Sequence, residues 1–156
     1  MARSTKPRKK YRPKRNLQNP IDYVLKSVKP ASQDAQTNLK VGYHLSMAAL
    51  CKGEGSTHDW QNVSDAMNVA MVLCEMGYGE EYLPDLSTAM QSILAMRDRY
   101  KQGMSLLFRG EEMQAVNLGL ELHDAQVEEV PLAAFERALA EVERRLARGI
   151  FLKRAA

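Results

Sequence analysis

Residues 56–77 read STHDWQNVSDAMNVAMVLCEMG and contain one complete helix together with its start and stop signals. Ser56 or Thr57 is a favourable N-cap, and Asp59 follows Ser56 at the spacing of a capping box. Gly77 is placed to end the helix in a left-handed conformation. Between these ends the apolar residues recur every three or four positions, which predicts a helix with one buried side: Trp60, Val63, Ala66, Met67, Ala70, Leu73, Cys74 and Met76.

Two further helices are predicted before this one. Asn19 is an N-cap, Pro20 suits the first helical position, and Pro30 ends the short helix that they start. The next helix begins near Ser32 and ends at Gly53, so it forms an antiparallel hairpin with the helix of residues 56–77. Its expected buried stripe consists of Leu39, Gly42, Leu45, Ala49 and Leu50. The glycine in this stripe leaves room for another helix to approach closely.

Three more helices are predicted after residue 77, over residues 82–101, 111–128 and 131–149. The segment 104–108 either prolongs the first of these or forms a separate turn. The helix of residues 111–128 is apolar on two sides, which is typical of a central helix. The last helix has a seam of coiled-coil type, which packs inside the monomer or mediates self-association: Leu132, Phe135, Leu139, Val142 and Leu146.

No segment shows the alternation of a strand, so the fold class is all-α: a compact bundle of five to six helices with an extended basic N-terminal tail. We expect a flexible basic tail over residues 1–18, a helical domain over 19–149 and a short basic tail over 150–156. No apolar run approaches eighteen residues, so no membrane span is expected. The N-terminal charges precede no apolar segment, which argues against a secretory signal. With Cys51 and Cys74 as the only cysteines, we expect reduced thiols and a cytoplasmic location.

The first fifteen residues carry eight positive charges and no acid, whereas the rest of the chain holds 14 basic and 19 acidic residues. A basic tail on an acidic body is typical of a protein that meets a polyanion, most often nucleic acid. Nothing in the tail reads base edges, so we expect binding that is mainly independent of sequence. The predicted contacts are the eight cations together with a tyrosine that can stack on an exposed base: Arg3, Lys6, Arg8, Lys9, Lys10, Tyr11, Arg12, Lys14 and Arg15.

Two alternatives for the tail stay open: docking onto an acidic protein surface, including the body of the same chain, and a solubilising terminus without a partner. A second basic cluster near the C-terminus is expected to lengthen the surface that a polyanion contacts. It consists of Arg144, Arg145, Arg148, Lys153 and Arg154.

Other site signals are weak. A helix-turn-helix is disfavoured, because the would-be recognition helix carries Asp59 and Asp65 but no Lys or Arg. No metal site is expected, since the spacings of the four available His and Cys ligands match no common zinc pattern. The Met-rich helix faces are expected to fill the core, with a docking surface as the alternative. These faces comprise Met67, Met71, Met76, Met90 and Met96, and the four ligands are His44, Cys51, His58 and Cys74.

Enzyme signals are equally sparse, because the chain has no phosphate-binding loop, nucleotide fingerprint or hydrolase elbow. His123 and Asp124 are neighbours that diverge by about 100° on a helix and cannot easily pair. His123 falls on a packed stripe and is expected to be a core histidine satisfied by one hydrogen bond. We therefore predict no catalytic residue and no cofactor, with an enzyme that uses His123 as a minor alternative.

Three segments resemble a group of small proteins encoded by bacteriophages and prophages of proteobacteria: KKYRPKRNLQNP (residues 9–20), FRGEEMQAVN (108–117) and LHDAQ (122–126). The resemblance spans most of the chain and implies a cytoplasmic accessory protein made during growth of a phage or mobile element. Such proteins commonly regulate transcription, package DNA or block a host defence complex. The group has no assigned function, so the resemblance gives no residue a role.

The sequence thus predicts a non-enzymatic accessory protein whose tail contacts nucleic acid and whose acidic body makes a specific contact with a protein partner. The rival hypothesis is a protein-only inhibitor or adaptor, for example an anti-defence protein, that acts through the acidic body. Residues 16–143 hold 9 basic and 19 acidic side chains, which supports the rival. Neither hypothesis distinguishes DNA from RNA.

Overall fold

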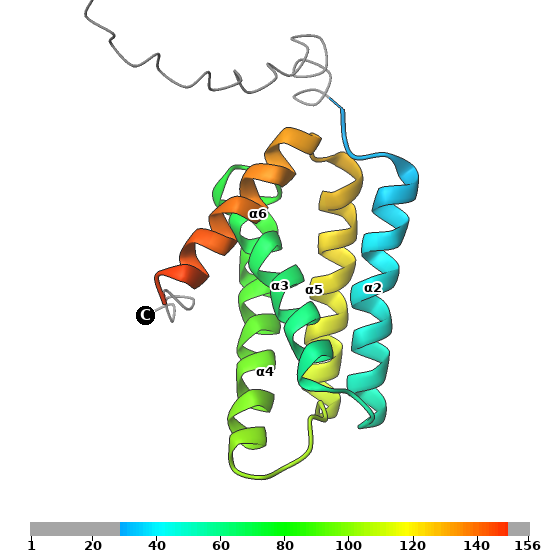
Figure 1. The fold of residues 1–156 in the computed structure, drawn as a ribbon, viewed down its shortest axis with the longest axis vertical. Coiled ribbons are helices and arrows are strands. Elements are labelled where there is room, and N and C mark those ends of the chain that lie inside the picture. The colour runs from blue at the N-terminus through cyan, green and yellow to red at the C-terminus, as the bar shows by residue number, and fades with distance from the viewer. Residues whose placement is uncertain (1–28, 150–156) are drawn as a thin grey trace, which may run out of the picture.

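The computed structural model describes residues 29–149, which form five α-helices, one short 3-10 helix and no strand. The prediction of an all-α bundle is confirmed. The expected tail over residues 1–18, the expected helix over 20–29 and the segment 150–156 lie outside the described residues. No described helix is long and apolar enough to cross a membrane. The elements are α2 (Gln33–Lys52), α3 (Thr57–Glu75), η1 (Glu80–Tyr82), α4 (Leu83–Lys101), α5 (Gly110–Glu129) and α6 (Leu132–Ala147) (Figure 1).

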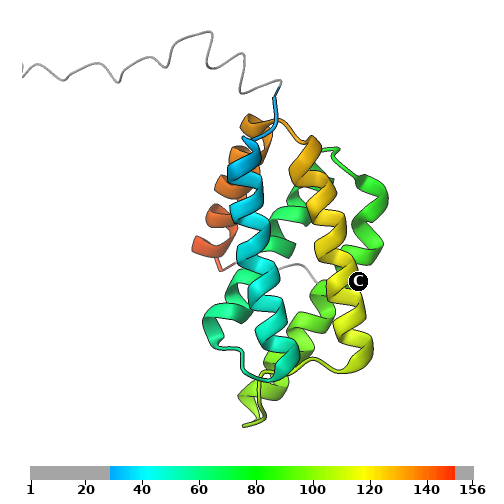
Figure 2. The same ribbon diagram turned by 90° about the vertical axis from the view of Figure 1, so that its right-hand side faces the viewer.

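Helix α3 lies at the centre of the bundle, because it packs against α2, α4, α5 and α6 (Figures 1 and 2). The expectation that residues 111–128 would form the central helix is therefore wrong. Helix α5 packs against α2, α3 and α4, but Leu118 on its outer side is exposed. An apolar pattern on two sides of a helix does not by itself require that both sides are covered.

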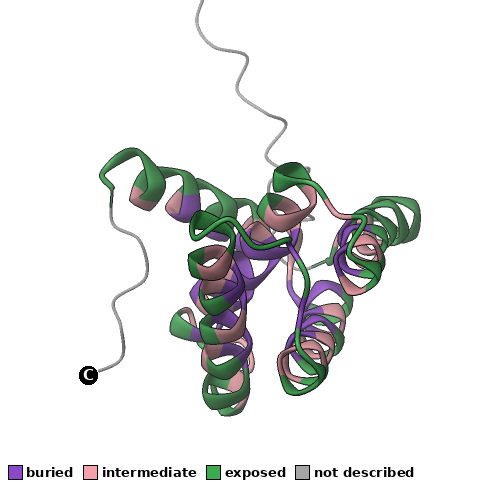
Figure 3. Ribbon diagram, turned by 90° about the horizontal axis from the view of Figure 1, so that it is seen from below, coloured by how far each residue is buried: buried purple, intermediate pink, exposed green. Residues whose placement is uncertain are grey.

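The core has two parts, and buried residues line the inner sides of the helices (Figure 3). The larger part joins α2, α3, α4 and α5, and four methionines fill it: Met47, Met67, Met90 and Met96. The smaller part lies between α3 and α6, where Val69 and Leu73 are packed against Ala134 and Ala138. Small residues on α6 let the two helix axes approach closely.

Both predicted end signals of α3 are confirmed. The Ser56 hydroxyl accepts from the Asp59 amide at 3.3 Å, and the Asp59 carboxylate accepts from the Ser56 amide at 2.8 Å. These hydrogen bonds hold the pKa of Asp59 below its ordinary value. At the other end Gly77 has φ 92°, and the Tyr78 amide donates to the Leu73 carbonyl at 2.9 Å. This is a Schellman motif, which satisfies carbonyls that the helix end leaves open.

Helix α2 begins and ends as expected, with Ser32 as N-cap and Gly53 in a left-handed conformation after its last residue. The expected buried stripe is wrong for Leu39, Gly42 and Leu45, which face solvent, and confirmed for Leu50, which is fully buried. Helix α2 contains two apolar stripes, and the one that faces the core carries the larger side chains, which bury more apolar area. That stripe consists of Tyr43, Met47 and Leu50, with Ser46 beside it.

The expected seam of α6 is also displaced. Ala134, Ala138 and Val142 are buried, whereas Leu139 and Leu146 are exposed. The helix rotates its small residues toward α3 because the valines there leave little space. Residues 104–108 do not prolong α4; they form a loop in which Leu106 and Phe108 are buried.

Close helix approach occurs at Gly119 of α5 rather than at Gly42. A Cβ atom at Gly119 would lie 2.9 Å from the Ala89 Cβ and 2.9 Å from the Met67 Sδ. A Cβ atom at Gly42 would meet nothing within 4 Å. Of these two helical glycines, the fold needs the one where α3, α4 and α5 meet.

Candidate functional site: a groove on α3 between α4 and α6

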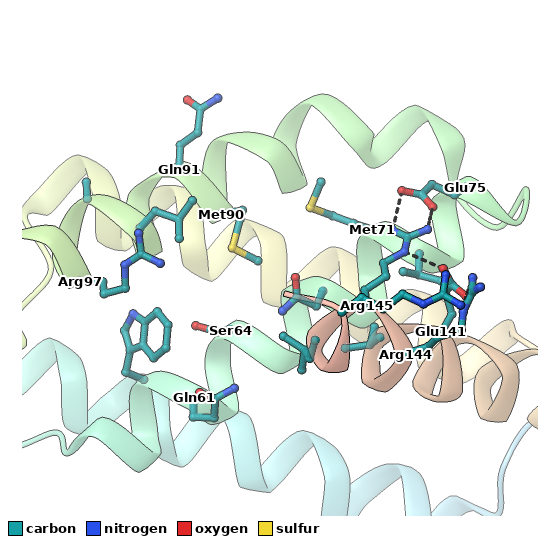
Figure 4. Close-up of a pocket in the computed structure, with 18 of the residues that line it drawn as sticks. Gln61, Ser64, Met71, Glu75, Met90, Gln91, Arg97, Glu141, Arg144 and Arg145 are labelled. Carbon is teal, nitrogen blue, oxygen red and sulfur yellow. Dashed lines mark hydrogen bonds and ion pairs between the residues drawn. The ribbon is translucent and has the colours of Figure 1, made fainter. Parts of the chain in front are cut away.

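A groove of about 1110 Å³ runs between α4 and α6, and one side of α3 forms its floor (Figure 4). Helix α4 packs against α3 and α5, whereas α6 packs against α3 further toward the C-terminal end of that helix. The two helices diverge (Figure 1), so a strip of α3 between them stays open. Five of the residues that α3 contributes are spaced by three and four positions: Gln61, Ser64, Asn68, Met71 and Glu75. Trp60 and Val72 line the groove beside them.

The floor combines apolar side chains with one unpartnered hydroxyl. Met71 of α3 and Met90 and Leu94 of α4 give it an apolar, adaptable lining. The Ser64 Oγ is buried and has no hydrogen-bond partner among the described residues. A buried hydroxyl without a partner costs about 1–3 kcal/mol, which a ligand group able to hydrogen-bond to Ser64 would recover.

Ion pairs form the rim of the groove beside α6. The Arg145 guanidinium donates to the Glu75 carboxylate of α3 and, at 2.7 Å, to the Glu141 carboxylate of α6 (Figure 4). Arg144 donates to the same Glu141 at 2.8 Å. These bonds raise the pKa of Arg145 and hold the pKa of Glu141 below its ordinary value. The network ties α6 to α3 along the groove.

The predicted second basic cluster is thus partly neutralised inside the body, because Arg144 and Arg145 each face a carboxylate. Arg148 is exposed at the groove and makes no ion pair within residues 29–149. Arg97 lies on the opposite rim, where it bonds to its neighbour Asp98 at 3.1 Å. Lys153 and Arg154 lie outside the described residues.

All predicted tail contacts, residues 3–15, lie outside the described residues as well. The described chain begins at Lys29, whose carbonyl accepts from the Leu132 amide at 2.8 Å, at the start of α6. This end of the bundle brings together the start of α2, η1 and the end of α5 (Figures 1 and 2). It is rich in exposed carboxylates, which come from Asp34, Glu80, Glu81, Asp85, Glu129 and Glu136.

His123 is a core residue, as expected. It is 1% exposed, its Nδ1 lies 3.1 Å from the Gln126 Oε1, and its ring is stacked with that of Phe135. Its Nε2 is buried without a partner among the described residues. Burial lowers the pKa of His123 to about 4, so the ring is neutral at pH 7.

His123 and Asp124 do not pair, as predicted from their divergence on the helix. Asp124 instead accepts from the Tyr43 hydroxyl and lies 2.9 Å from the His44 Nε2, both on α2. Burial and the Asp124 carboxylate raise the pKa of Tyr43 above its ordinary value. This cluster fastens α5 to α2, and a Lys40–Glu128 ion pair one turn away does the same.

The four potential metal ligands do not come together within the described residues. His44 faces Asp124, and the Cys74 thiol donates to the Gly79 carbonyl at 2.9 Å. Burial raises the pKa of both Cys51 and Cys74, which keeps the thiols protonated. No group of three or more His, Cys, Asp or Glu suited to a metal ion occurs in residues 29–149.

The sequence did not indicate the groove. Its signal is the pair of polar residues Ser64 and Asn68, which interrupts the apolar surface of α3 one turn apart. Four residues of separation place both on the same side of the helix. The sequence does not show that this side of α3 is left open, because its exposure depends on how α4 and α6 diverge. No protein-family model, curated protein or solved structure matches this chain.

Proposed function

We propose that this protein is a non-enzymatic accessory protein that binds nucleic acid through its basic N-terminal tail, with a regulatory or host-interaction role. The observation that carries the proposal is the separation of charge along the chain. Eight cations and no acid occupy residues 1–15, whereas residues 16–143 hold 9 basic and 19 acidic side chains. A polyanion is attracted to the tail and repelled by most of the body.

The distribution of charge in the bundle supports this division of roles. Four of its arginines already face carboxylates and are less available to phosphate: Arg97, Arg99, Arg144 and Arg145. The end of the bundle at Lys29 is rich in exposed carboxylates. Phosphate contacts therefore depend on residues 1–15, and the binding is mainly independent of sequence.

The test measures binding of a labelled duplex and a labelled single strand of random sequence across a series of salt concentrations. Full engagement of eight cations gives a slope of log affinity against log salt that approaches roughly −7. Deletion of residues 1–15 should abolish retention and flatten this slope. In the matched control, Arg144→Gln with Arg148→Gln should keep most of the affinity. Equal binding by the truncated and the full chain would refute the role of the tail.

The groove and the carboxylate-rich end favour a second candidate, a protein-only inhibitor or adaptor that acts through the helical body. The groove offers an apolar lining and an unpartnered hydroxyl, which are features of a protein-docking surface. The two candidates are separated by pull-down from nuclease-treated host lysate. A direct protein partner survives both nuclease and deletion of residues 1–15, but is lost when Met71→Glu places a charge in the groove. Partners that are bridged to this protein by nucleic acid are lost after nuclease treatment and also after deletion of residues 1–15.

A further inference from the structure

The outer side of α2 is an apolar surface that the described bundle leaves uncovered. Leu45 is 66% exposed and Val41 is 48% exposed, although both lie in the middle of a twenty-residue helix. Gly42, Ala48 and Ala49 flank them, and no described segment crosses this side in Figure 2. The only charged residue between positions 35 and 51 is Lys40, which is paired with Glu128 of α5.

The surface has polar ends of opposite charge. At 100° per residue, Asp34, Asn38 and Lys52 lie within about 20° of Leu45 around the helix axis. Asp34 and Lys52 are exposed, and neither makes an ion pair within residues 29–149. The outer side of α2 therefore has an acid at its start, an apolar middle and a base at its end.

We infer that the outer side of α2 binds the same side of a second copy of this chain, with the two helices antiparallel. An antiparallel pair brings Asp34 of each copy toward Lys52 of the other, whereas a parallel pair would place like charges together. Residue 43 is midway between Asp34 and Lys52. An arrangement that pairs these charges therefore also places Val41 and Leu45 at the centre of the contact.

The apolar residues lie opposite one another in this arrangement. About the two-fold axis near residue 43, Val41 of one copy faces Leu45 of the other, and Asn38 faces Ala48. The two most exposed apolar side chains of α2 thus meet across the axis, and the open space at Gly42 admits the second helix beside them.

The two charged ends favour a second copy as the occupant, because a second copy brings its own Asp34 and Lys52 to complement them.

The test is sedimentation velocity of the full chain without nucleic acid, over a range of micromolar concentrations, since one helix pair is at the low end of stable interfaces. We expect a concentration-dependent dimer for the natural chain and a monomer at every concentration for Leu45→Glu. The matched control is Leu118→Glu on α5, which changes another exposed leucine and should keep the dimer. Equal behaviour of the two variants, or a natural chain that stays monomeric, would overturn the inference.

Two further variants separate pairing from folding. Gly42→Gln adds a side chain where the monomer has open space, so it should weaken the dimer at least ten-fold without lowering the melting temperature. Asp34→Lys and Lys52→Asp should each weaken the dimer, and their combination should restore it if the helices are antiparallel. Failure of the double variant to recover would refute the antiparallel arrangement, and a stronger dimer for Gly42→Gln would refute close contact at that position.

Discussion

His123 makes the stability of this protein depend on pH. Its ordinary pKa of 6.5 is lowered to about 4, chiefly by burial, with His44 and Lys40 also disfavouring the cation and Asp124 favouring it. Between these values the unfolded chain binds a proton that the folded chain does not, so the free energy of unfolding falls as the pH falls. The full contribution is about 3 kcal/mol. Urea titrations between pH 7 and pH 4 should show this loss.

Variants at two histidines check the origin of that loss. His123→Leu removes the group and should flatten the dependence of stability on pH between 6.5 and 4. His58→Gln changes an exposed histidine in the first turn of α3 and should leave the dependence as it is. If both variants kept the full slope, the contribution assigned to His123 would be wrong.

The two helical glycines Gly42 and Gly119 should respond in opposite ways to alanine. Gly42→Ala adds a methyl group in open space and should raise the free energy of unfolding by about 0.5–1 kcal/mol, because glycine is a poor helix former. Gly119→Ala meets Ala89 and Met67 at 2.9 Å and should lower it by about 1–3 kcal/mol. Urea titration of both variants measures the difference, and two changes of the same sign would contradict it.

The role of a single residue could be predicted from the sequence where one local interaction determines it. The capping box of Ser56 and Asp59 and the left-handed Gly77 could be predicted, because each depends on local spacing. The core position of His123 followed from its apolar neighbours. The need for glycine at position 119 could not be predicted, since it depends on Ala89 and Met67, which are remote in the chain.

The contact between α4 and α5 depends on one paired carboxylate. Arg99 of α4 donates twice to Glu112 of α5 at 2.6 Å, and both side chains are largely buried. Glu112 also accepts from the Arg109 amide at 2.8 Å, which caps α5. The bonds from Arg99 and Arg109 hold the pKa of Glu112 below its ordinary value of 4.5. The pair thus contributes stability above that pH and loses it as the carboxyl group is protonated.

Glu112→Gln should therefore lower the free energy of unfolding at pH 7 by about 1–3 kcal/mol, because Arg99 keeps a largely buried charge without its partner. The difference from the natural chain should shrink as the pH falls through the range in which Glu112 takes up its proton. Glu111→Gln removes the same charge from an exposed neighbour and should change stability by less than about 0.5 kcal/mol. Thermal unfolding of the natural chain and of both variants at several pH values measures these differences in stability.

The bounds of the elements were easier to predict than the sides that they bury. Caps and glycines placed the ends of α2, α3 and α4 within a few residues, since these signals are local. The buried sides of α2 and α6 were predicted only in part, with Leu50 and Val142 right and Leu45 and Leu139 wrong, because each helix has two apolar stripes and periodicity alone does not choose between them. The choice depends on the neighbour: α3 presents valines to α6 and therefore receives Ala134 and Ala138.

In the whole molecule α6 is the least supported helix. It packs mainly against α3, and the Arg145–Glu75 ion pair joins the two at the groove. We expect its amides to exchange with solvent faster than those of α3, which is covered by four helices. Arg145→Gln should accelerate exchange in α6 about two- to five-fold and leave α3 unchanged.

The matched control for this prediction is Arg137→Gln, which removes another exposed arginine of α6. Hydrogen exchange followed by mass spectrometry resolves α6 from α3. Equal acceleration in both helices would mean that the bundle opens as one unit and that α6 has no separate motion.

The overall architecture was predictable and the groove was not, for one physical reason. Composition and periodicity report which residues avoid water, and they indicated an all-α bundle. The open strip along Ser64 and Met71 arises from the angle between α4 and α6, a property of packing that no single segment encodes. The basic charge of the tail could be predicted directly, because it is a property of the sequence and does not depend on the fold.

The hydrogen bond from Leu132 to the Lys29 carbonyl has a mechanical consequence. Lys29 is therefore connected to α2 through the chain and to the first turn of α6 through this hydrogen bond. Since α6 forms one wall of the groove, a displacement of Lys29 would act on that wall as well as on α2.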